Sequence, residues 1–236
     1  MNIPDANVIT QSLTEDFINL GKKMNLDISY LKEKHQILIE GSWDWLAKIY
    51  LPWNLEFDNK AGFSLKENFH FALVMIRAGQ AVVGHSHDGV LLDHKVFRAY
   101  MVRQKQGKSQ IKYLKTKGKS RAGSRIRLGE TERFFKEINE RLTEYSSNSP
   151  IDIWGISCGK TLWPFYFKSE TAPPFLQNQE NLINIPFHIA QASLESLENV
   201  KTQLGKFHLL LSDKGKEIFS ELGFTKNDEE TESDNW

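Results

Sequence analysis

Apolar residues recur at helical spacing in several parts of the chain. In residues 11–25, apolar side chains stand three or four residues apart, from Leu13 to Met24. This spacing places them on one side of a helix. Residues 131–145 and 190–204 repeat the pattern, and a shorter stretch of the same kind occupies residues 214–222. The periodicity therefore predicts helices over these four stretches.

Short apolar runs bounded by turn residues predict strands between the helices. Asp88 and Gly89 form a hairpin-turn pair between two of these runs. The predicted strands cover residues 36–40, 69–77, 80–84, 90–102, 151–157, 162–167 and 206–211. Strands and helices alternate in the second half of the chain, which favours an α/β fold. We expect a single domain with a central mixed β-sheet flanked by helices.

The pattern also suggests how the chain is divided. The 236 residues, 40% of them hydrophobic, are enough for a substantial core. We expect residues 1–60 to form an N-terminal extension packed on that core, and residues 61–224 to form the core domain. Residues 225–236 are acidic and poor in apolar side chains, which is typical of a disordered tail.

Composition bears on the compartment in which the protein works. Cys158 is the single cysteine, so no internal disulfide can form. The first residues lack the basic and apolar regions of a secretory signal. No apolar stretch approaches the 18 or so residues that a membrane span needs. We therefore expect a soluble cytoplasmic protein.

The charges are distributed very unevenly along the chain. Residues 94–129 carry twelve Lys and Arg and no Asp or Glu, so the rest of this neutral chain carries a net charge of −12. Folding does not require such asymmetry, whereas a concentrated positive surface attracts polyanions, of which nucleic acid is the commonest. Residues 103–123, rich in Lys, Gly and Ser, are predicted to be a mobile loop that contacts phosphates.

The same run holds a recognisable order of residues. A strand with His-Lys and Tyr-x-Val-Arg is followed by Gly-x-x-Gln, a Lys-rich stretch, and Ala-Gly-x-x-Ile-Arg at the expected start of a helix. The residues that match are His94, Lys95, Tyr100, Val102, Arg103, Lys105, Gln106, Gly107, Ser109, Gln110, Ala122, Gly123, Ile126 and Arg127. Over about residues 69–145 the chain resembles the Vms-one-like release-factor family of ribosome-associated quality control. It departs from the pattern at Arg98, Lys108 and Leu128.

The resemblance implies a fold similar to the RNase H-like catalytic domain of the archaeal and eukaryotic termination factor. It further implies hydrolysis of peptidyl-tRNA on the large ribosomal subunit of a stalled ribosome. No carboxylate lies within the basic run, so we expect no metal and no cofactor. Gln110 would be the catalytic side chain, with Arg103 and Arg127 beside the reacting group. The residues expected to contact RNA are Lys95, Arg98, Lys105, Gly107, Lys108, Ser109, Lys112, Lys115, Lys117, Lys119, Arg121 and Arg125.

Two other functions stay open at this point. One is metal-independent endonucleolytic cleavage near the tRNA 3′ end, in which a ribose 2′-OH attacks the adjacent phosphate. The other is a non-catalytic ribosome- or RNA-binding module, which Lys108 and Leu128 favour slightly. The sequence does not separate the two reactions, because both would use the same residues.

Three further motifs suggest other chemistry more weakly. His85, His87 and Asp88 resemble metal ligands, but no third or fourth ligand with the right context is evident. Residues 155–161 are one residue short of a phosphate-binding loop. Nothing marks Cys158 as an activated nucleophile. The tryptophans Trp43, Trp45 and Trp53 are predicted to lie in the core rather than to stack on bases.

Overall fold

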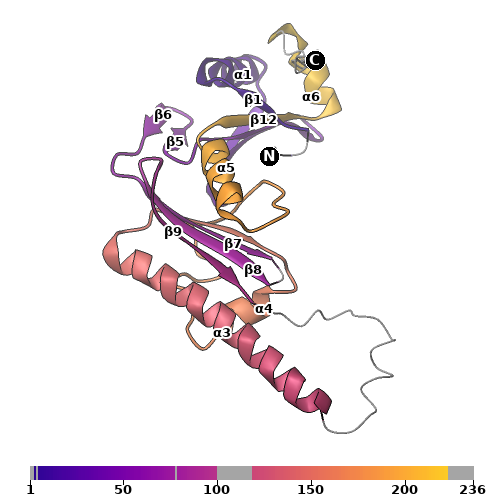
Figure 1. Ribbon diagram of the computed structural model, residues 1–236. Coiled ribbons are helices and arrows are strands. Elements are labelled where there is room, and N and C mark those ends of the chain that lie inside the picture. The colour runs from indigo at the N-terminus through magenta and orange to yellow at the C-terminus, as the bar shows by residue number, and fades with distance from the viewer. Residues whose placement is uncertain (1–2, 4, 78, 100–118, 223–236) are drawn as a thin grey trace, which may run out of the picture.

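The computed structural model describes residues 3, 5–77, 79–99 and 119–222, and of residues 119–128 only the backbone. These residues form a mixed α/β structure with two five-stranded sheets and a small hairpin (Figure 1). Among the residues that the structure describes, no helix has the length and hydropathy needed to cross a membrane.

The central sheet is mixed, as the sequence predicts. Its strands lie in the order β11-β10-β7-β8-β9. Strands β7, β10 and β11 run parallel to one another, whereas β8 is antiparallel to both β7 and β9. The bounds are β7 His70–Arg77, β8 Gln80–His87, β9 Val90–Arg98, β10 Ile153–Cys158 and β11 Leu182–Asn184.

Helices cover both faces of this sheet (Figure 1). On one face lies the long helix α3 (Lys119–Asn148), whose Phe135, Ile138 and Leu142 pack in a cluster with β7 and β8. On the other face α5 (Leu194–Leu204) places Leu197 against β8. The contact is close, because a Cβ atom on Gly84 would stand 2.7 Å from Leu197. Alternating side chains of the strands thus fill two separate apolar layers.

The second sheet joins the two ends of the chain. Its order is β1-β12-β4-β3-β2, and every pairing in it is antiparallel. The bounds are β1 Asn7–Ile9, β2 Asp27–Leu31, β3 Gln36–Glu40, β4 Trp45–Tyr50 and β12 Phe207–Leu211. Helix α1 (Gln11–Lys23) packs Phe17 and Ile18 into a third apolar cluster on this sheet. The end of the expected core domain therefore completes the sheet of the N-terminal region.

The remaining elements are short. They are the hairpin strands β5 Leu55–Asp58 and β6 Gly62–Leu65, the helices α4 Trp163–Phe167 and α6 Asp213–Ile218, and the 3-10 turns Lys32–Lys34 and Ser220–Leu222. Helix α4 corrects the strand predicted at residues 162–167. Pro164 lies at its start, where a helix tolerates proline because the first N–H groups have no partner within the helix.

Two element boundaries also differ from the expectation. Helix α3 starts at Lys119, so residues 119–123, which were predicted to belong to the mobile loop, are helical. Strand β9 ends at Arg98, and the rest of the predicted strand at residues 100–102 lies outside the described residues. The predicted tail at residues 225–236 also lies outside them.

Candidate functional site at the end of the central sheet

Residues 99–118, called the basic segment below, lie in sequence between strand β9 and helix α3. The described chain before this segment stops at the end of the central sheet where several strands terminate. Strands β7 and β10 are parallel, and their C-terminal ends lie here. Strand β9 also ends here, because β7 and β9 are both antiparallel to β8. The backbone N–H of Ala99 donates a hydrogen bond to the Gly79 carbonyl, at 3.0 Å. This bond holds the exit of the chain next to the β7–β8 turn. Residues 99–118 then connect β9 to the start of α3.

The structure places six of the fifteen predicted site residues. Lys95 and Arg98 are exposed on β9, and the Lys95 Nζ lies 5.1 Å from the centre of the Phe97 ring. The backbone of Lys119, Arg121, Arg125 and Arg127 lies in α3. The other nine lie outside the described residues: Arg103, Lys105, Gly107, Lys108, Ser109, Gln110, Lys112, Lys115 and Lys117.

Arg127 lies farther along α3 than the sequence suggests. The helix begins eight residues before it, which is a rise of about 12 Å along the axis. The favourable field of a helix N-terminus fades within the first turn. The Ala122–Arg127 motif is therefore inside the helix rather than at its start, and the helix dipole gives Arg127 no special affinity for an anion.

A shallow groove lies between the C-terminal end of β9 and helix α3. It has a volume of about 530 Å³ and is lined by Arg98, Ala99, Glu130, Arg133, Phe134 and Glu137. The Arg133 Nε donates to the Glu137 Oε1 at 2.6 Å. The two arginines and two glutamates of the lining cancel in formal charge. The lining of the groove therefore adds no net charge to the basic run at residues 94–129.

Arg77, at the end of β7, is a half-buried cation that the sequence analysis missed. Its guanidinium donates to the Ile189 carbonyl at 2.6 Å, to the Ile76 carbonyl, and to both the carbonyl and the hydroxyl of Ser157. These bonds join β7, β10 and the chain that follows β11. Burial lowers the pKa of Arg77. The one signal in the sequence for this residue is its position: Arg77 follows an apolar run and precedes the turn at Gly79.

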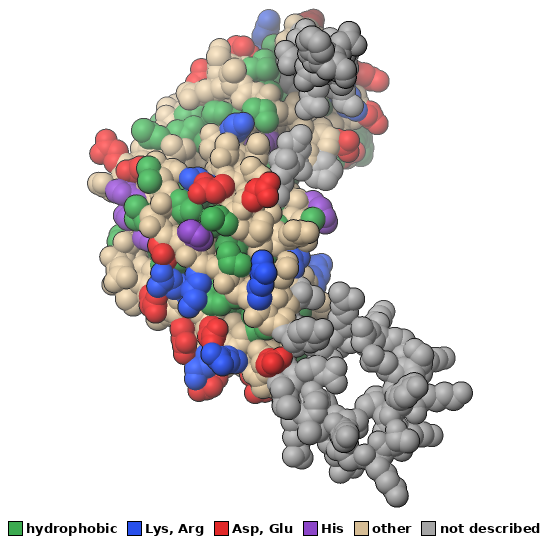
Figure 2. Space-filling view, in the orientation of Figure 1, with side chains coloured by type: hydrophobic (Ala, Val, Ile, Leu, Met, Phe, Trp, Pro, Cys, Tyr) green, Lys and Arg blue, Asp and Glu red, His purple; other side chains and the backbone are tan. Residues whose placement is uncertain are grey.

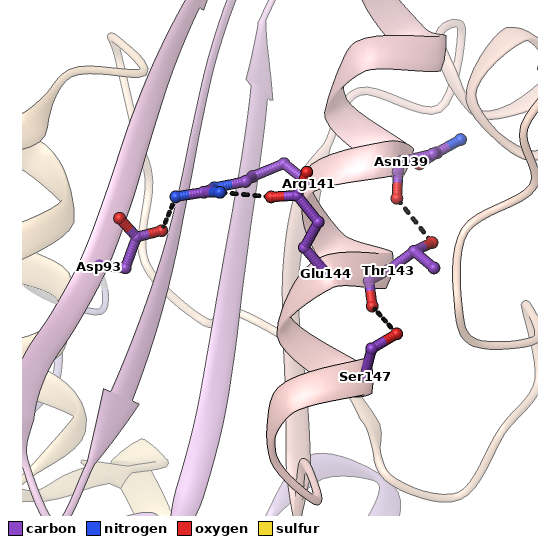
Figure 3. Close-up of polar contacts among 6 residues, drawn as sticks. All are labelled: Asp93, Asn139, Arg141, Thr143, Glu144 and Ser147. Atoms are coloured by element: carbon purple, nitrogen blue, oxygen red, sulfur yellow. Dashed lines mark hydrogen bonds and ion pairs between the residues drawn. The ribbon is translucent and has the colours of Figure 1, made fainter.

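Strand β9 and helix α3, which carry the two ends of the basic segment, are joined by an ionic network. Arg141 on α3 bonds both Asp93 on β9 and Glu144 one turn along the helix. Figure 3 shows the Arg141 side chain reaching from the helix toward Asp93. Burial alone would raise the pKa of Asp93. Hydrogen bonds and charge interactions with Tyr145 and Arg141 lower it by more, so the pKa of Asp93 lies below its usual value. The network therefore favours the charged carboxylate.

The neighbouring face of α3 is fixed by buried amide contacts. The Asn139 side chain is fully buried and donates to the carbonyls of Tyr166 and Thr171, at 3.2 and 2.8 Å. On the same helix the Thr143 and Ser147 hydroxyls donate to the carbonyls four residues earlier, at 2.9 and 2.8 Å (Figure 3). Helix α3 is thus tied to β9 on one side and to the chain around α4 on the other.

His85 and His87, which the sequence suggested as metal ligands, lie at the opposite end of the strands, next to His70. The His70 Nδ1 and the His85 Nε2 are 3.0 Å apart, and the His70 and His87 rings stack at 4.2 Å with only 6° between their planes. Nitrogen lone pairs lie in the ring planes, so rings stacked in this way cannot converge on one ion. Within the described ranges, no group of three or more His, Cys, Asp or Glu side chains could hold a metal.

The other motifs have structural explanations. Gly155 lies within β10, and a Cβ atom there would stand 2.4 Å from the Trp53 ring, so this glycine allows close packing rather than phosphate binding. Burial raises the pKa of Cys158 to about 12, which argues against a thiolate nucleophile. Trp53 is buried as predicted, but Trp43 is 92% exposed and is not part of the core.

Comparison with known proteins agrees with the resemblance in the sequence. The Bacteroidetes VLRF1 release factor family matches residues 70–211, which contain the whole central sheet. Because the match covers more than half of the 236 residues, the chain belongs to this release-factor family. Membership supports a role in translation and ribosome rescue.

A solved structure is similar over most of the chain. It is described as "Vms1 mitochondrial localization core" and is 11% identical to this chain, with a TM-score of 0.42. The matched region covers 87% of this chain and 91% of the solved chain. No curated protein matches the chain.

Proposed function

We propose that this protein frees nascent chains from stalled ribosomes by hydrolysing peptidyl-tRNA, with Gln110 reaching the 3′ end of the tRNA. The observation that carries the proposal is the position of the acid-free basic run. The run begins on β9 and ends in α3, so both elements that flank its centre belong to the central sheet and the helix packed on it. Membership of the release-factor family supports the ribosome as the target.

The length of the segment suits a deep binding site. Gln110 is twelve residues beyond Arg98 and nine before Lys119. Because an extended chain spans at most about 3.5 Å per residue, Gln110 can lie up to roughly 30 Å from the start of α3. Such a reach, on a segment without carboxylates, would allow the loop to enter an RNA-lined cavity while the folded domain stays outside.

The sheet and α3 form a firm base for such a loop. The Ala99–Gly79 hydrogen bond fixes where the segment begins, and the Asp93–Arg141 pair joins the strand before it to the helix after it. Holding both ends limits the volume that the loop explores, which lowers the entropy cost of placing its centre at a reacting bond.

The chemistry required of Gln110 is modest. A glutamine side chain has no useful pKa, so it cannot act as a conventional general base. Its amide can hold a water molecule, or orient the terminal ribose, next to the ester of peptidyl-tRNA. The ester is already reactive, so positioning and stabilisation of the oxyanion by backbone N–H groups would suffice. Arg103 and Arg127 would bind the nearby phosphates through their planar guanidinium groups.

Endonucleolytic cleavage near the tRNA 3′ end is the second candidate function. It would use the same segment, with a 2′-OH as nucleophile and the arginines stabilising charge on the phosphate. Lys108 and Leu128 depart from the family pattern and favour a third candidate, a module that binds without catalysis.

Sizing both products separates the three candidates. Purified protein is incubated with stalled ribosome–nascent chain complexes, and the peptide and the tRNA are then analysed. The proposal predicts a free peptide and a tRNA with an intact 3′ end. A shortened tRNA would show cleavage instead, and unchanged peptidyl-tRNA on ribosomes that hold the protein tightly would show binding alone.

A further inference from the structure

Strand β9 lies at one of the two edges of the central sheet. It spans nine residues and pairs on one side with β8. Among the described residues, no strand pairs with its other side. Val90, Leu92 and Val96 are 64%, 54% and 39% exposed. A long, apolar edge strand is a template for pairing with another chain.

We propose that two copies of this chain form a two-fold dimer by antiparallel pairing of their β9 strands, centred on His94. In this register, residues equally far from His94 face each other across the pair. Asp93 then faces the partner's Lys95, and Leu92 faces the partner's Val96. Opposed side chains lie on the same face of an antiparallel pair, so both contacts are favourable.

The charge order of β9 selects this partner and this register. Asp93 and Lys95 are the two charged residues beside His94, and they have opposite signs. An exposed Lys on an edge strand normally opposes self-association. Here the two-fold register neutralises it with a carboxylate from the second copy. A shift by two residues in the register would remove this complementarity.

Helix α3 adds a second self-complementary surface. Arg133, Glu137, Arg141 and Glu144 recur every three or four residues, so they share one side of the helix, and their signs alternate. Arg141 bonds Asp93, which shows that this side lies along β9. Figure 2 shows side chains of both charges over the α3 region, below apolar ones over the sheet.

The same two-fold axis would pair both surfaces at once. An axis perpendicular to the sheet keeps both α3 helices on one face and makes them antiparallel. Because Asp93 contacts Arg141, the axis at His94 passes near the middle of the charged stretch of α3. Arg133 then approaches the partner's Glu144, and Glu137 approaches the partner's Arg141. One operation therefore satisfies the charges on the strand and on the helix.

The register has a natural limit. A β-bulge between β8 and β9 lies opposite His85 and Ser86, at the Leu92 position of β9. Bulges bend the strand that carries them. Regular pairing therefore spans Asp93 to Lys95, and Leu92 faces the partner's Val96 at the bulge itself. The dimer joins two five-stranded sheets into one of ten strands, with the two basic segments at opposite ends.

Charge exchange tests the register directly. In Lys95→Asp, carboxylates face each other twice across the dimer, and in Asp93→Lys, ammonium groups do. Each variant alone should dimerise about tenfold more weakly than wild type in sedimentation velocity. An equimolar mixture should recover the wild-type affinity, because the exchanged charges then face each other. Lys206→Asp, the same charge change on an exposed residue after α5, should dimerise like wild type.

A cross-link tests the axis without relying on Asp93, whose removal also affects Arg141. In a Cys158→Ala background, His94→Cys places two cysteines directly opposite each other, within the Cα separation that a disulfide spans. It should oxidise to a covalent dimer, whereas Val90→Cys, far from the axis, should not. The proposal is overturned if wild type remains monomeric up to its solubility limit, if the charge mixture does not recover dimers, or if both cysteine variants cross-link equally.

Discussion

Asp93 on the edge strand β9 and Arg141 on helix α3 form an ion pair that joins the two elements from which the basic segment departs. The pair is partly buried and includes Glu144 on the far side of the guanidinium. It therefore connects the stability of the sheet edge with the placement of the segment.

Loss of this pair should destabilise the domain modestly. In Arg141→Gln the Asp93 carboxylate keeps its half-buried place without its cation. A partly exposed pair of this kind contributes about 1 kcal/mol, which corresponds to a melting temperature lower by roughly 2–4 °C. Arg133→Gln, which removes an exposed pair on the same helix, should leave the melting temperature nearly unchanged. Equal melting temperatures for the two variants would contradict the role given to Asp93–Arg141.

His35 should make the protein less stable in mild acid. It is 3% exposed, and its two nitrogens lie 2.7 Å from the Tyr30 hydroxyl and 2.9 Å from the Pro52 carbonyl. Burial lowers the pKa of His35 from 6.5 to about 4. Between these values the unfolded chain binds a proton that the folded chain does not, so the free energy of unfolding falls as the pH falls.

The size of this effect can be measured by urea denaturation from pH 7 to pH 4. The His35 contribution over the whole window is on the order of 3 kcal/mol. The loss of stability should be smaller in His35→Gln, although that variant is less stable at pH 7. His188→Gln, a change at an exposed histidine, should follow the wild-type curve. Parallel curves for wild type and His35→Gln would show that His35 does not drive the acid sensitivity.

Two glycine-to-alanine changes should have opposite effects. In Gly155→Ala the new methyl group meets Trp53 and Leu73, at 2.4 and 2.6 Å, which should cost about 1–3 kcal/mol. In Gly129→Ala the methyl group enters open space on α3, where alanine favours the helix by up to about 1 kcal/mol. Chemical denaturation of both variants gives the signs. A stable Gly155→Ala protein would mean that the Trp53 contact is looser than described.

The basic segment should bind RNA mainly through phosphates. Changing four lysines in this segment and at the start of α3 to Glu should reduce the slope of log affinity against log salt by about 0.7–0.9 for each phosphate that the variant no longer binds. The four lysines are Lys112, Lys115, Lys117 and Lys119. Four exposed lysines of the N-terminal region provide the control, and their reversal should change the slope little. They are Lys22, Lys23, Lys32 and Lys34. An unchanged slope after the first set would mean that those lysines contact no phosphate.

The fold class and most of the central sheet follow from local patterns. Residues 71–76 are continuously apolar because β7 is covered on both faces, and the Asp88-Gly89 turn fixes the β8–β9 hairpin. The sequence does not reveal that β12 lies between β1 and β4, because pairing of residues about 160 to 200 positions apart leaves no local signal. Nor does it separate α4 from a strand, since a five-residue aromatic stretch fits either.

The candidate site is predictable in its charge but not in its geometry. Counting charges finds the run at residues 94–129, and the motif selects Gln110. The sequence misplaces the start of α3, and with it Arg127, because Lys119 to Arg127 contains few apolar residues to mark a helix face. It also misses Arg77 and Asp93–Arg141, which depend on contacts between distant segments.

The central claim is that Gln110 carries the release reaction, and single-turnover release on stalled ribosomes tests it most directly. Gln110→Ala should bind the ribosome like wild type but lose nearly all release of the nascent peptide. Gln104→Ala, the same change six residues earlier in the segment, should keep its activity. Release by Gln110→Ala at the wild-type rate would contradict the account.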